Sequence, residues 1–369
     1  MASAIPQGKL AEIVPAARSR TGVPAVAAGL SVDGTVELAA DGPCDVDTPF
    51  RVASITKWFT ASLAAKSVGL EPELRRLLSH TADLRPGSGE PLPGACRGLW
   101  SYANAGYWAA GDAIAAATGL SYSDAMREQV LEPLQLDATS FEEPAEAAPG
   151  HLQDGESGHR LAPPSEYPVS RRPSGGLWST VADLLRFAEK QLDDPDGLQQ
   201  PQAEALGAEY CLGCWRRELA GGRVAFDHEG SVAGYQSLLL LVPAERAALA
   251  VLTNSWRGSG LIRRVVQALG LVPASDNLSL AQTGPVQPGR YALDGDEATV
   301  ALQHGGLRIG GSSLDPVSGQ RIEQPPLSVT PLGGGVYGMA GGLLMSHRAD
   351  FPRPRVARIG WVALPRAGS

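Results

Sequence analysis

The sequence predicts an α+β fold followed by a small all-β domain, on the basis of three observations. An amphipathic helix pattern over residues 10–20 precedes a strand pattern over residues 23–32. A largely helical stretch then runs from residue 54 to residue 134, and strand patterns resume between residues 209 and 253. Because strands lie at both ends and helices between them, we expect one discontinuous α+β domain.

Turn and capping signals give these elements approximate bounds. Asp33-Gly34 indicates a hairpin turn after the first strand, and Gly119 ends a helix. Residues 137–173 are rich in Pro, Gly, Glu and Ala, which predicts a long loop suited to lining a site. The expected helices cover residues 54–67, 74–80, 105–119, 122–134, 179–188 and 261–269, and the later strands cover residues 209–216, 223–226, 235–242 and 247–253.

The character of the chain changes after Pro273. Short alternating runs, separated by Gly, Pro and Asp, continue almost to the C-terminus and are typical of a small all-β domain. We therefore expect a first domain over residues 1–273, a linker over residues 274–287 and a β-domain over residues 288–369.

Composition argues against several classes of function. A net charge of −8 gives no basic surface for nucleic acid or for an anionic membrane. No stretch approaches the length of a membrane span, and the N-terminus lacks the pattern of a signal peptide. We expect a cytoplasmic protein that binds neither nucleic acid nor membrane.

The cysteines and histidines do not predict a cofactor site. Cys211 and Cys214 have the C-x-x-C spacing of zinc and redox motifs, but neither Cys44 nor Cys96 has a partner at metal-ligand spacing. Their apolar neighbours predict buried, unreactive thiols in a strand. With no glycine-rich phosphate loop and no H-E-x-x-H motif, we expect neither metal nor cofactor. Four histidines without chemical context are expected to be solvated: His151, His159, His304 and His347.

The segment from Arg51 to Trp58 places a serine and a lysine three residues apart. If a helix begins at Ser54, Lys57 lies on the same face one turn later. A neutral lysine amine there can take the hydroxyl proton, which a serine nucleophile must lose at neutral pH. A helix N-cap serine followed by a solvated lysine would give the same pattern, so this motif alone decides little.

Two more motifs follow in a fixed order. Tyr102 and Asn104 have Y-x-N spacing, and His228 and Gly230 have H-x-G spacing before an apolar strand. Residues 77–84 add a leucine-leucine-x-histidine-threonine stretch. Together with S-x-x-K, this order over residues 8–270 resembles the class C β-lactamase-like and penicillin-binding-protein-like serine hydrolases. The resemblance implies a β-lactamase/D,D-peptidase-like fold: an antiparallel sheet flanked by helices, with a helical subdomain.

The resemblance also implies a role for each motif residue. Ser54 would form a covalent acyl-enzyme, while Lys57 and Tyr102 share the proton transfer, each lowering the other's pKa. His228 would hydrogen-bond near Tyr102 or the substrate. The backbone N–H groups of Ser54 and Ser231 would form the oxyanion hole, and His80 is expected to be structural and bonded to backbone. The residues expected to contact substrate are Asn104, Gly230, Ser231, Glu229 and Arg366.

Two departures from the family pattern concern the substrate. The stretch between Lys57 and Leu77 is shorter than in typical relatives, which predicts an open pocket or one completed by another chain. Glu229 stands where threonine is common. A carboxylate facing the site would repel a substrate carboxylate, which argues against efficient penicillin binding.

The motifs specify a mechanism more closely than a substrate. One interpretation is a stand-alone penicillin-binding-protein-type thioesterase that releases and macrocyclises a nonribosomal peptide from a carrier protein. The β-domain resembles the lipocalin-like domain of those enzymes, and Arg366 is a candidate, by position, to hold the acceptor's carboxylate. A carboxylesterase or amide hydrolase acting on small molecules requires the same residues. A D,D-peptidase, a β-lactamase or a binding protein without turnover fits less well.

Overall fold

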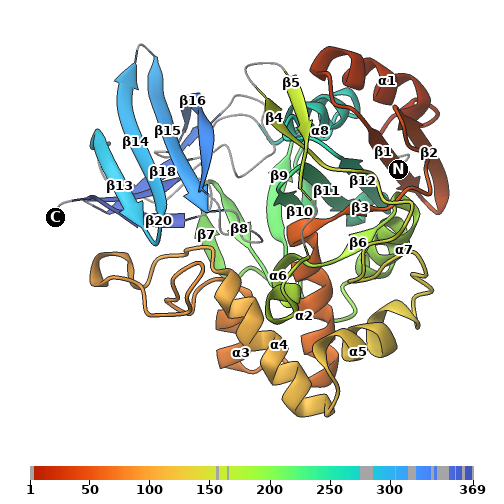
Figure 1. The fold of residues 1–369 in the computed structure, drawn as a ribbon, viewed down its shortest axis with the longest axis horizontal. Helices are drawn as coiled ribbons and strands as arrows, with labels where there is room; N and C mark the ends of the chain where they lie inside the picture. Colours follow the sequence, from red (N-terminus) through yellow and green to blue (C-terminus); the bar gives the residue numbers. More distant parts are fainter. Residues whose placement is uncertain are drawn as a thin grey trace.

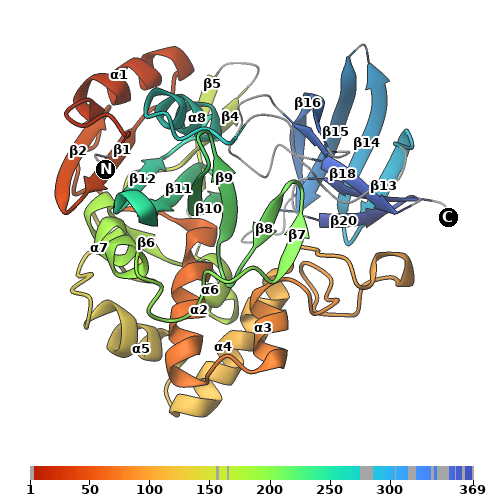
Figure 2. The ribbon, with the colours of Figure 1, turned by 180° about the vertical axis from the view of Figure 1, so that it is seen from behind.

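Two β-structures lie side by side in the computed structural model: a large sheet covered by helices, and an eight-stranded barrel-like domain (Figures 1 and 2). The structure describes residues 4–154, 158–163, 166–274, 286–303, 305–314, 321–333, 336–338, 349–353, 355–359 and 362–367. Most of the predicted linker, together with His304 and His347, lies outside these residues.

The large sheet joins strands from both ends of the first 273 residues. In spatial order its strands are β2 (Thr35–Asp41), β1 (Val26–Val32), β12 (Ala247–Thr253), β11 (Tyr235–Val242), β10 (Arg223–Val232), β9 (Trp215–Leu219), β8 (Ala208–Tyr210) and β7 (Ala203–Ala205). β1 and β12 are almost continuously apolar because both of their faces are covered, and they pair antiparallel from Val26↔Thr253 to Val32↔Ala247. The predicted discontinuous α+β domain is confirmed.

Helices cover both faces of this sheet. One face packs against α1 (Leu10–Thr21) and α8 (Gly258–Ala268), and the other against α7 (Val181–Gln191) and the helical subdomain. The subdomain contains α2 (Thr56–Ser67), α3 (Pro72–Leu78), α4 (Asn104–Thr118), α5 (Tyr122–Met126) and the short α6 (Arg172–Gly175). Two small antiparallel pairs complete this part: β3 (Phe50–Arg51) with β6 (Trp178–Ser179), and β4 (His151–Asp154) with β5 (Gly158–Leu161).

Three predicted elements differ from the observed ones. The helix expected over residues 122–134 ends at Met126 and continues as a π-helical turn, Arg127–Leu131. The strand expected over residues 209–216 is split into β8 and β9 by the turn that holds Cys211 and Cys214. The expected loop over residues 137–173 contains the β4–β5 hairpin.

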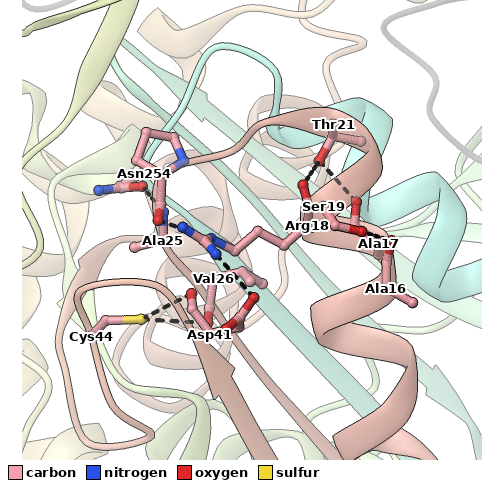
Figure 3. A network of polar contacts seen from close by, with 11 residues as sticks. Ala16, Ala17, Arg18, Ser19, Thr21, Ala25, Val26, Asp41, Cys44 and Asn254 are labelled. Carbon is pink, nitrogen blue, oxygen red and sulfur yellow. Dashed lines mark hydrogen bonds and ion pairs between the residues drawn. The ribbon is translucent and has the colours of Figure 1, made fainter.

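Polar contacts join the N-terminal helix, the sheet and the middle of the chain (Figure 3). An Nη1 atom of Arg18 in α1 lies 3.1 Å from an Asp41 carboxylate oxygen at the end of β2. Asn254, directly after β12, accepts a hydrogen bond from the Ala25 N–H at 2.8 Å. Its amide also donates to the Pro149 carbonyl at 2.8 Å, which anchors the start of the β4–β5 hairpin at the edge of the sheet.

The C-terminal domain is an up-and-down meander in which each strand pairs with the next. Its strands are β13 (Gly289–Leu293), β14 (Asp296–Gln303), β15 (Gly306–Leu314), β16 (Arg321–Gly333), β17 (Val336–Gly338), β18 (Ala349–Arg353), β19 (Val356–Ile359) and β20 (Val362–Pro365). A bridge between Tyr291 and Arg366 brings the two ends of the meander together. This nearly closed barrel fits the predicted lipocalin-like architecture.

The barrel packs against the loop between α3 and α4, which runs beneath it in Figure 1. Leu92 and Cys96 of that loop are buried in the barrel's own hydrophobic cluster. The Ala363 N–H of β20 donates to Ser101 Oγ at 3.2 Å, one residue before Tyr102. The barrel therefore contacts the segment that carries the Y-x-N motif. None of the helices in the described ranges has the length and apolarity needed to cross a membrane.

Candidate active site

Ser54 lies in a tight turn where β3 passes into α2. The turn is a 3-10 helix, Ala53–Ile55, and α2 proper begins at Thr56, so Ser54 precedes the helix that it was expected to begin. Ala53 has φ of +47°, a conformation that residues other than glycine rarely adopt. Backbone strain of this kind clusters at functional sites, where the surrounding structure holds it in place.

Lys57 is fully buried, and its amine points back to Ser54. Its Nζ lies 3.2 Å from Ser54 Oγ and also donates to the Ser174 carbonyl. Both partners are neutral, and burial lowers the pKa of Lys57 well below its ordinary value. The amine is therefore suited to be neutral and to accept the Ser54 hydroxyl proton.

Ser174 is a site residue that the sequence did not reveal. It acts through its backbone carbonyl, so its side chain type gives no signal. α6 holds it in place: Trp108 Nε1 donates to Ser174 Oγ at 2.9 Å, and that hydroxyl lies 2.9 Å from the Arg171 carbonyl. The next residue, Gly175, has no space for a side chain, because a Cβ there would lie 2.6 Å from the Tyr167 hydroxyl.

Tyr102 lies against Lys57, as predicted, but its pKa moves in the opposite direction. The Lys57 Nζ is 4.8 Å from the centre of the Tyr102 ring. Burial raises the pKa of Tyr102 well above its usual value, and the influence of the Ser54 side chain opposes this rise only in part. The expectation that the two groups lower each other's pKa is wrong for Tyr102, because desolvation disfavours phenolate. Half-buried Asn104 begins α4 two residues later.

His228 is buried on the face of β10 that looks toward α2. Its ring centre lies 6.3 Å from that of Tyr102, and its Nε2 lies 3.4 Å from the Tyr210 hydroxyl. Burial, with the nearby Lys57 as a second cause, lowers the pKa of His228 to about 3. His80 has the structural contact expected of it, since its Nδ1 accepts a hydrogen bond from the Ala103 N–H at 3.0 Å.

Gly230 allows β10 to touch the strand that leads to Ser54. A Cβ at Gly230 would lie 2.1 Å from the Val52 carbonyl oxygen and 2.1 Å from Ser237 Oγ. No other residue fits there without moving β10 or the turn before Ser54. This contact brings the H-x-G strand beside the serine.

The next residue, Ser231, lies on an open edge of β10. Strand β9 pairs with β10 only as far as Asp227. Val232 and Tyr235 face each other across a two-residue turn, so the Ser231–Gln236 pair is one whose N–H and C=O groups point away from β11. The Ser231 N–H therefore points to the unpaired edge, as an oxyanion-hole donor requires.

Glu229 does not face the site as supposed. It pairs with Leu238, whose side chain packs with α1 and α8, and neighbouring residues of a strand point to opposite faces. Glu229 therefore lies on the opposite side of β10 from His228. A direct contact between its carboxylate and a substrate carboxylate is therefore not supported, but its charge still acts on the site by raising the pKa of Tyr102.

Arg366 lies at the seam of the barrel. Its guanidinium lies 3.5 Å from Gln287 Oε1 and donates to the Pro288 carbonyl at 3.0 Å, at the entrance to β13. None of these contacts links Arg366 to Ser54. A role in holding an acceptor's carboxylate stays a prediction.

The cysteines are free thiols, and three of them are buried. Cys211 and Cys214 are buried in a turn, not in a strand, and burial raises the pKa of Cys214. His151 and His159 are half-buried and hydrogen-bonded to the Asn254–Ser255 segment, so the expectation of solvated side chains is wrong for both. Within the described ranges, no cluster of His, Cys, Asp or Glu could hold a metal ion.

Comparison with known proteins agrees with this geometry. The family model described as Beta-lactamase matches residues 10–71 and 70–271. Penicillin-binding protein 4 of Amycolatopsis lactamdurans is 29% identical over 319 residues, which cover 65% of this chain and 83% of that protein.

Two solved structures show the same fold. The crystal structure of SurE has a TM-score of 0.69 at 21% identity and covers 96% of this chain and 98% of that one; SurE has also been crystallised with D-Leu. A D-stereospecific amidohydrolase from a Streptomyces species has a TM-score of 0.60 at 21% identity and covers 70% of this chain and 96% of that one. From the family match and the motifs together, this chain belongs to the β-lactamase family, as a serine hydrolase of the β-lactamase-like and penicillin-binding-protein-like type.

Proposed function

We propose that the enzyme works through a covalent acyl-enzyme on Ser54, and the observation that carries this is the buried Lys57 amine beside the serine hydroxyl. Lys57 Nζ takes the proton of Ser54 Oγ while that oxygen attacks the acyl carbon of the substrate. The oxyanion that forms is stabilised by the N–H groups of Ser54 and Ser231. His228, whose lowered pKa keeps it neutral near pH 7, adds no competing cation beside Lys57.

Tyr102 delivers the proton to the leaving group. Since burial raises its pKa, Tyr102 is a phenol and can donate, and the Lys57 ammonium resupplies it. The proton from Ser54 thereby ends on the departing thiol or amine, and the acyl group stays on Ser54. Asn104, on the first turn of α4, is proposed to orient the substrate amide or ester.

We further propose a D-configured peptidyl thioester as the acyl donor, presented by a carrier protein and released as a macrocycle. The likeness to SurE extends through the barrel as well as the catalytic part, and SurE has been crystallised with D-Leu. In this chain the barrel packs on the segment just before Tyr102, which supports a role for the barrel beside the substrate. Hydrolysis of small amides is the second candidate, favoured by the likeness of the catalytic part to a D-stereospecific amidohydrolase.

The test separates cyclisation from hydrolysis with one pair of substrates. A peptidyl N-acetylcysteamine thioester with a D-configured C-terminal residue is offered with a free N-terminal amine and, as the matched control, with that amine acetylated. Product masses are read by liquid chromatography and mass spectrometry, with Ser54→Ala as the blank. A cyclic product from the free amine alone supports the acyl-transferring enzyme. Free acid from both peptides supports the hydrolase, and no conversion of either contradicts the peptidyl substrate.

A further inference from the structure

A line of four hydrogen bonds runs beneath the site from one backbone segment to another. The Ala103 N–H lies 3.0 Å from His80 Nδ1, and His80 Nε2 lies 3.1 Å from the Tyr210 hydroxyl. The same hydroxyl lies 3.4 Å from His228 Nε2, and His228 Nδ1 lies 2.6 Å from the Glu229 carbonyl oxygen. The line joins the Y-x-N segment to the H-x-G strand.

The two ends give the outer bonds of this line a direction. A backbone N–H can only donate, so His80 Nδ1 accepts, and the proton of its ring is on Nε2. A carbonyl oxygen can only accept, so His228 carries a proton on Nδ1, and in the neutral ring its Nε2 has a lone pair. The Tyr210 hydroxyl then accepts from His80, and in the proposed arrangement it donates to His228 Nε2. In this arrangement each group supplies one donor and one acceptor, and both rings are neutral.

We propose that His80 and Tyr210 are positioning residues of the hydrolase: they hold His228 as the neutral Nδ1–H tautomer and hold Tyr102 against Lys57. The proposal rests on the proposed function of Ser54. A neutral His228 favours that reaction for an electrostatic reason. Lys57 must become an ammonium ion when it takes the Ser54 proton, and a cationic imidazole beside it would oppose that step.

His80 also determines where Tyr102 lies. The centres of the His80 and Tyr102 rings are 4.1 Å apart, and the residue after Tyr102 donates to His80. His80 has φ of +61°, a costly conformation outside glycine, and it lies in the turn that follows α3. A protonated His80 would turn an N–H toward the Ala103 N–H, and the contact that fixes this segment would be lost.

The surroundings favour neutral rings as well. Lys57 lies near both histidines, and Arg217 on the adjacent strand β9 acts on His228. Burial lowers the pKa of both histidines, and for His228 the hydrogen bond to the Glu229 carbonyl oxygen opposes this only in part. The Glu229 carboxylate is on the other face of β10.

Tyr210 is itself held by aromatic packing. Its ring packs against Trp100 and Trp215, with ring centres 5.5 Å and 4.8 Å away. Tyr210 lies in the β7–β8 hairpin, and at the turn of this hairpin the Leu206 N–H donates to Asp350 of β18 at 3.4 Å. The hairpin that carries Tyr210 therefore contacts the barrel at its turn.

The test is the imidazole tautomer of each histidine, read by long-range proton–nitrogen NMR on the full-length ¹⁵N-labelled enzyme. We expect His80 as the Nε2–H tautomer and His228 as the Nδ1–H tautomer, both neutral and unchanged between pH 8 and pH 5. The opposite tautomer at either residue, or titration of either in that range, overturns the proposal. These spectra need no substrate, and Ser54→Ala should give the same tautomers. The spectra therefore test the tautomers independently of whether the proposed acyl transfer at Ser54 is correct.

A variant tests the consequence for catalysis. Tyr210→Phe removes the hydroxyl that donates to His228, so His228 should protonate at a higher pH, and the acidic limb of kcat for ester hydrolysis should move up with it. We expect kcat to fall by about 10- to 100-fold at neutral pH. The matched control is Tyr235→Phe, a buried tyrosine whose hydroxyl donates to the Ala148 carbonyl at 2.8 Å outside the line. An unchanged pH profile in Tyr210→Phe would contradict the role of the line, whereas Tyr235→Phe should leave profile and tautomers as they are.

Discussion

Gly230→Ala is the substitution that most directly challenges the assembly of the site. The added Cβ would lie 2.1 Å from the Val52 carbonyl and from Ser237 Oγ, whereas real Cβ contacts stay beyond 3.0 Å. The serine side chain can rotate, but the Val52 carbonyl is backbone two residues before Ser54. β10 and the nucleophile turn must therefore separate by close to 1 Å, which moves the Ser231 N–H away from the Ser54 N–H.

A displacement of this size should lower kcat/KM by about 100-fold, since 1 Å errors in catalytic geometry have that effect. Overpacking should also lower the free energy of unfolding by about 1–3 kcal/mol. Kinetics with a p-nitrophenyl ester and urea denaturation measure the two effects. The control is Gly260→Ala in α8, where the nearest atom is the Thr21 methyl at 3.9 Å and a helical alanine should be neutral or stabilising by up to about 1 kcal/mol. Full activity in Gly230→Ala would refute the close approach as the origin of the oxyanion hole.

Two further substitutions test the buried charges. Lys57→Met should abolish turnover yet raise Tm at pH 7, because lysine in the unfolded chain stays protonated up to about its ordinary pKa of 10.5, whereas the buried lysine of the folded chain does not. The gain in Tm should shrink as the pH approaches that value. A Tm lower than that of the unaltered enzyme would contradict this reasoning. Asp350→Asn leaves the Arg358 guanidinium, which is 6% exposed, without its carboxylate partner. The free energy of unfolding should fall by about 3–5 kcal/mol. An unchanged midpoint of urea denaturation would show that this ion pair does not stabilise the barrel.

The grouping of the candidate catalytic residues could largely be predicted from sequence because these side chains lie in short motifs. Ser54 and Lys57 are one helical turn apart, and the structure brings Tyr102 and His228 to them. Local patterns also predicted most helices and strands, since apolar periodicity and glycine caps are encoded within a few residues. The division of the hairpin around Cys211 was missed, because a tight turn between buried residues has no polar signal.

What could not be predicted depends on long-range contacts. The face on which Glu229 lies is determined by strand register with β11. Desolvation, which raises the pKa of Tyr102, depends on side chains from distant segments. Tyr210 and Ser174 belong to no motif, and each acts through a contact with a residue far along the chain.

The packing of the barrel against the catalytic part could not be predicted from the sequence either. Leu92 and Cys96 lie in a Gly/Pro-rich loop that looks like a surface connection, yet they complete the barrel's hydrophobic cluster. The partner strands are roughly two hundred residues or more away in the chain, so no local pattern indicates this contact.

The central claim is that Ser54 is acylated with the help of a neutral Lys57. Intact-protein mass spectrometry after mixing with a p-nitrophenyl ester and with a fluorophosphonate measures this directly, followed by peptide mapping. The account predicts a covalent adduct on the peptide that contains Ser54, no adduct in Ser54→Ala, and much slower labelling in Lys57→Met. An adduct that persists in Ser54→Ala, or labelling of Lys57→Met at the unaltered rate, would contradict it.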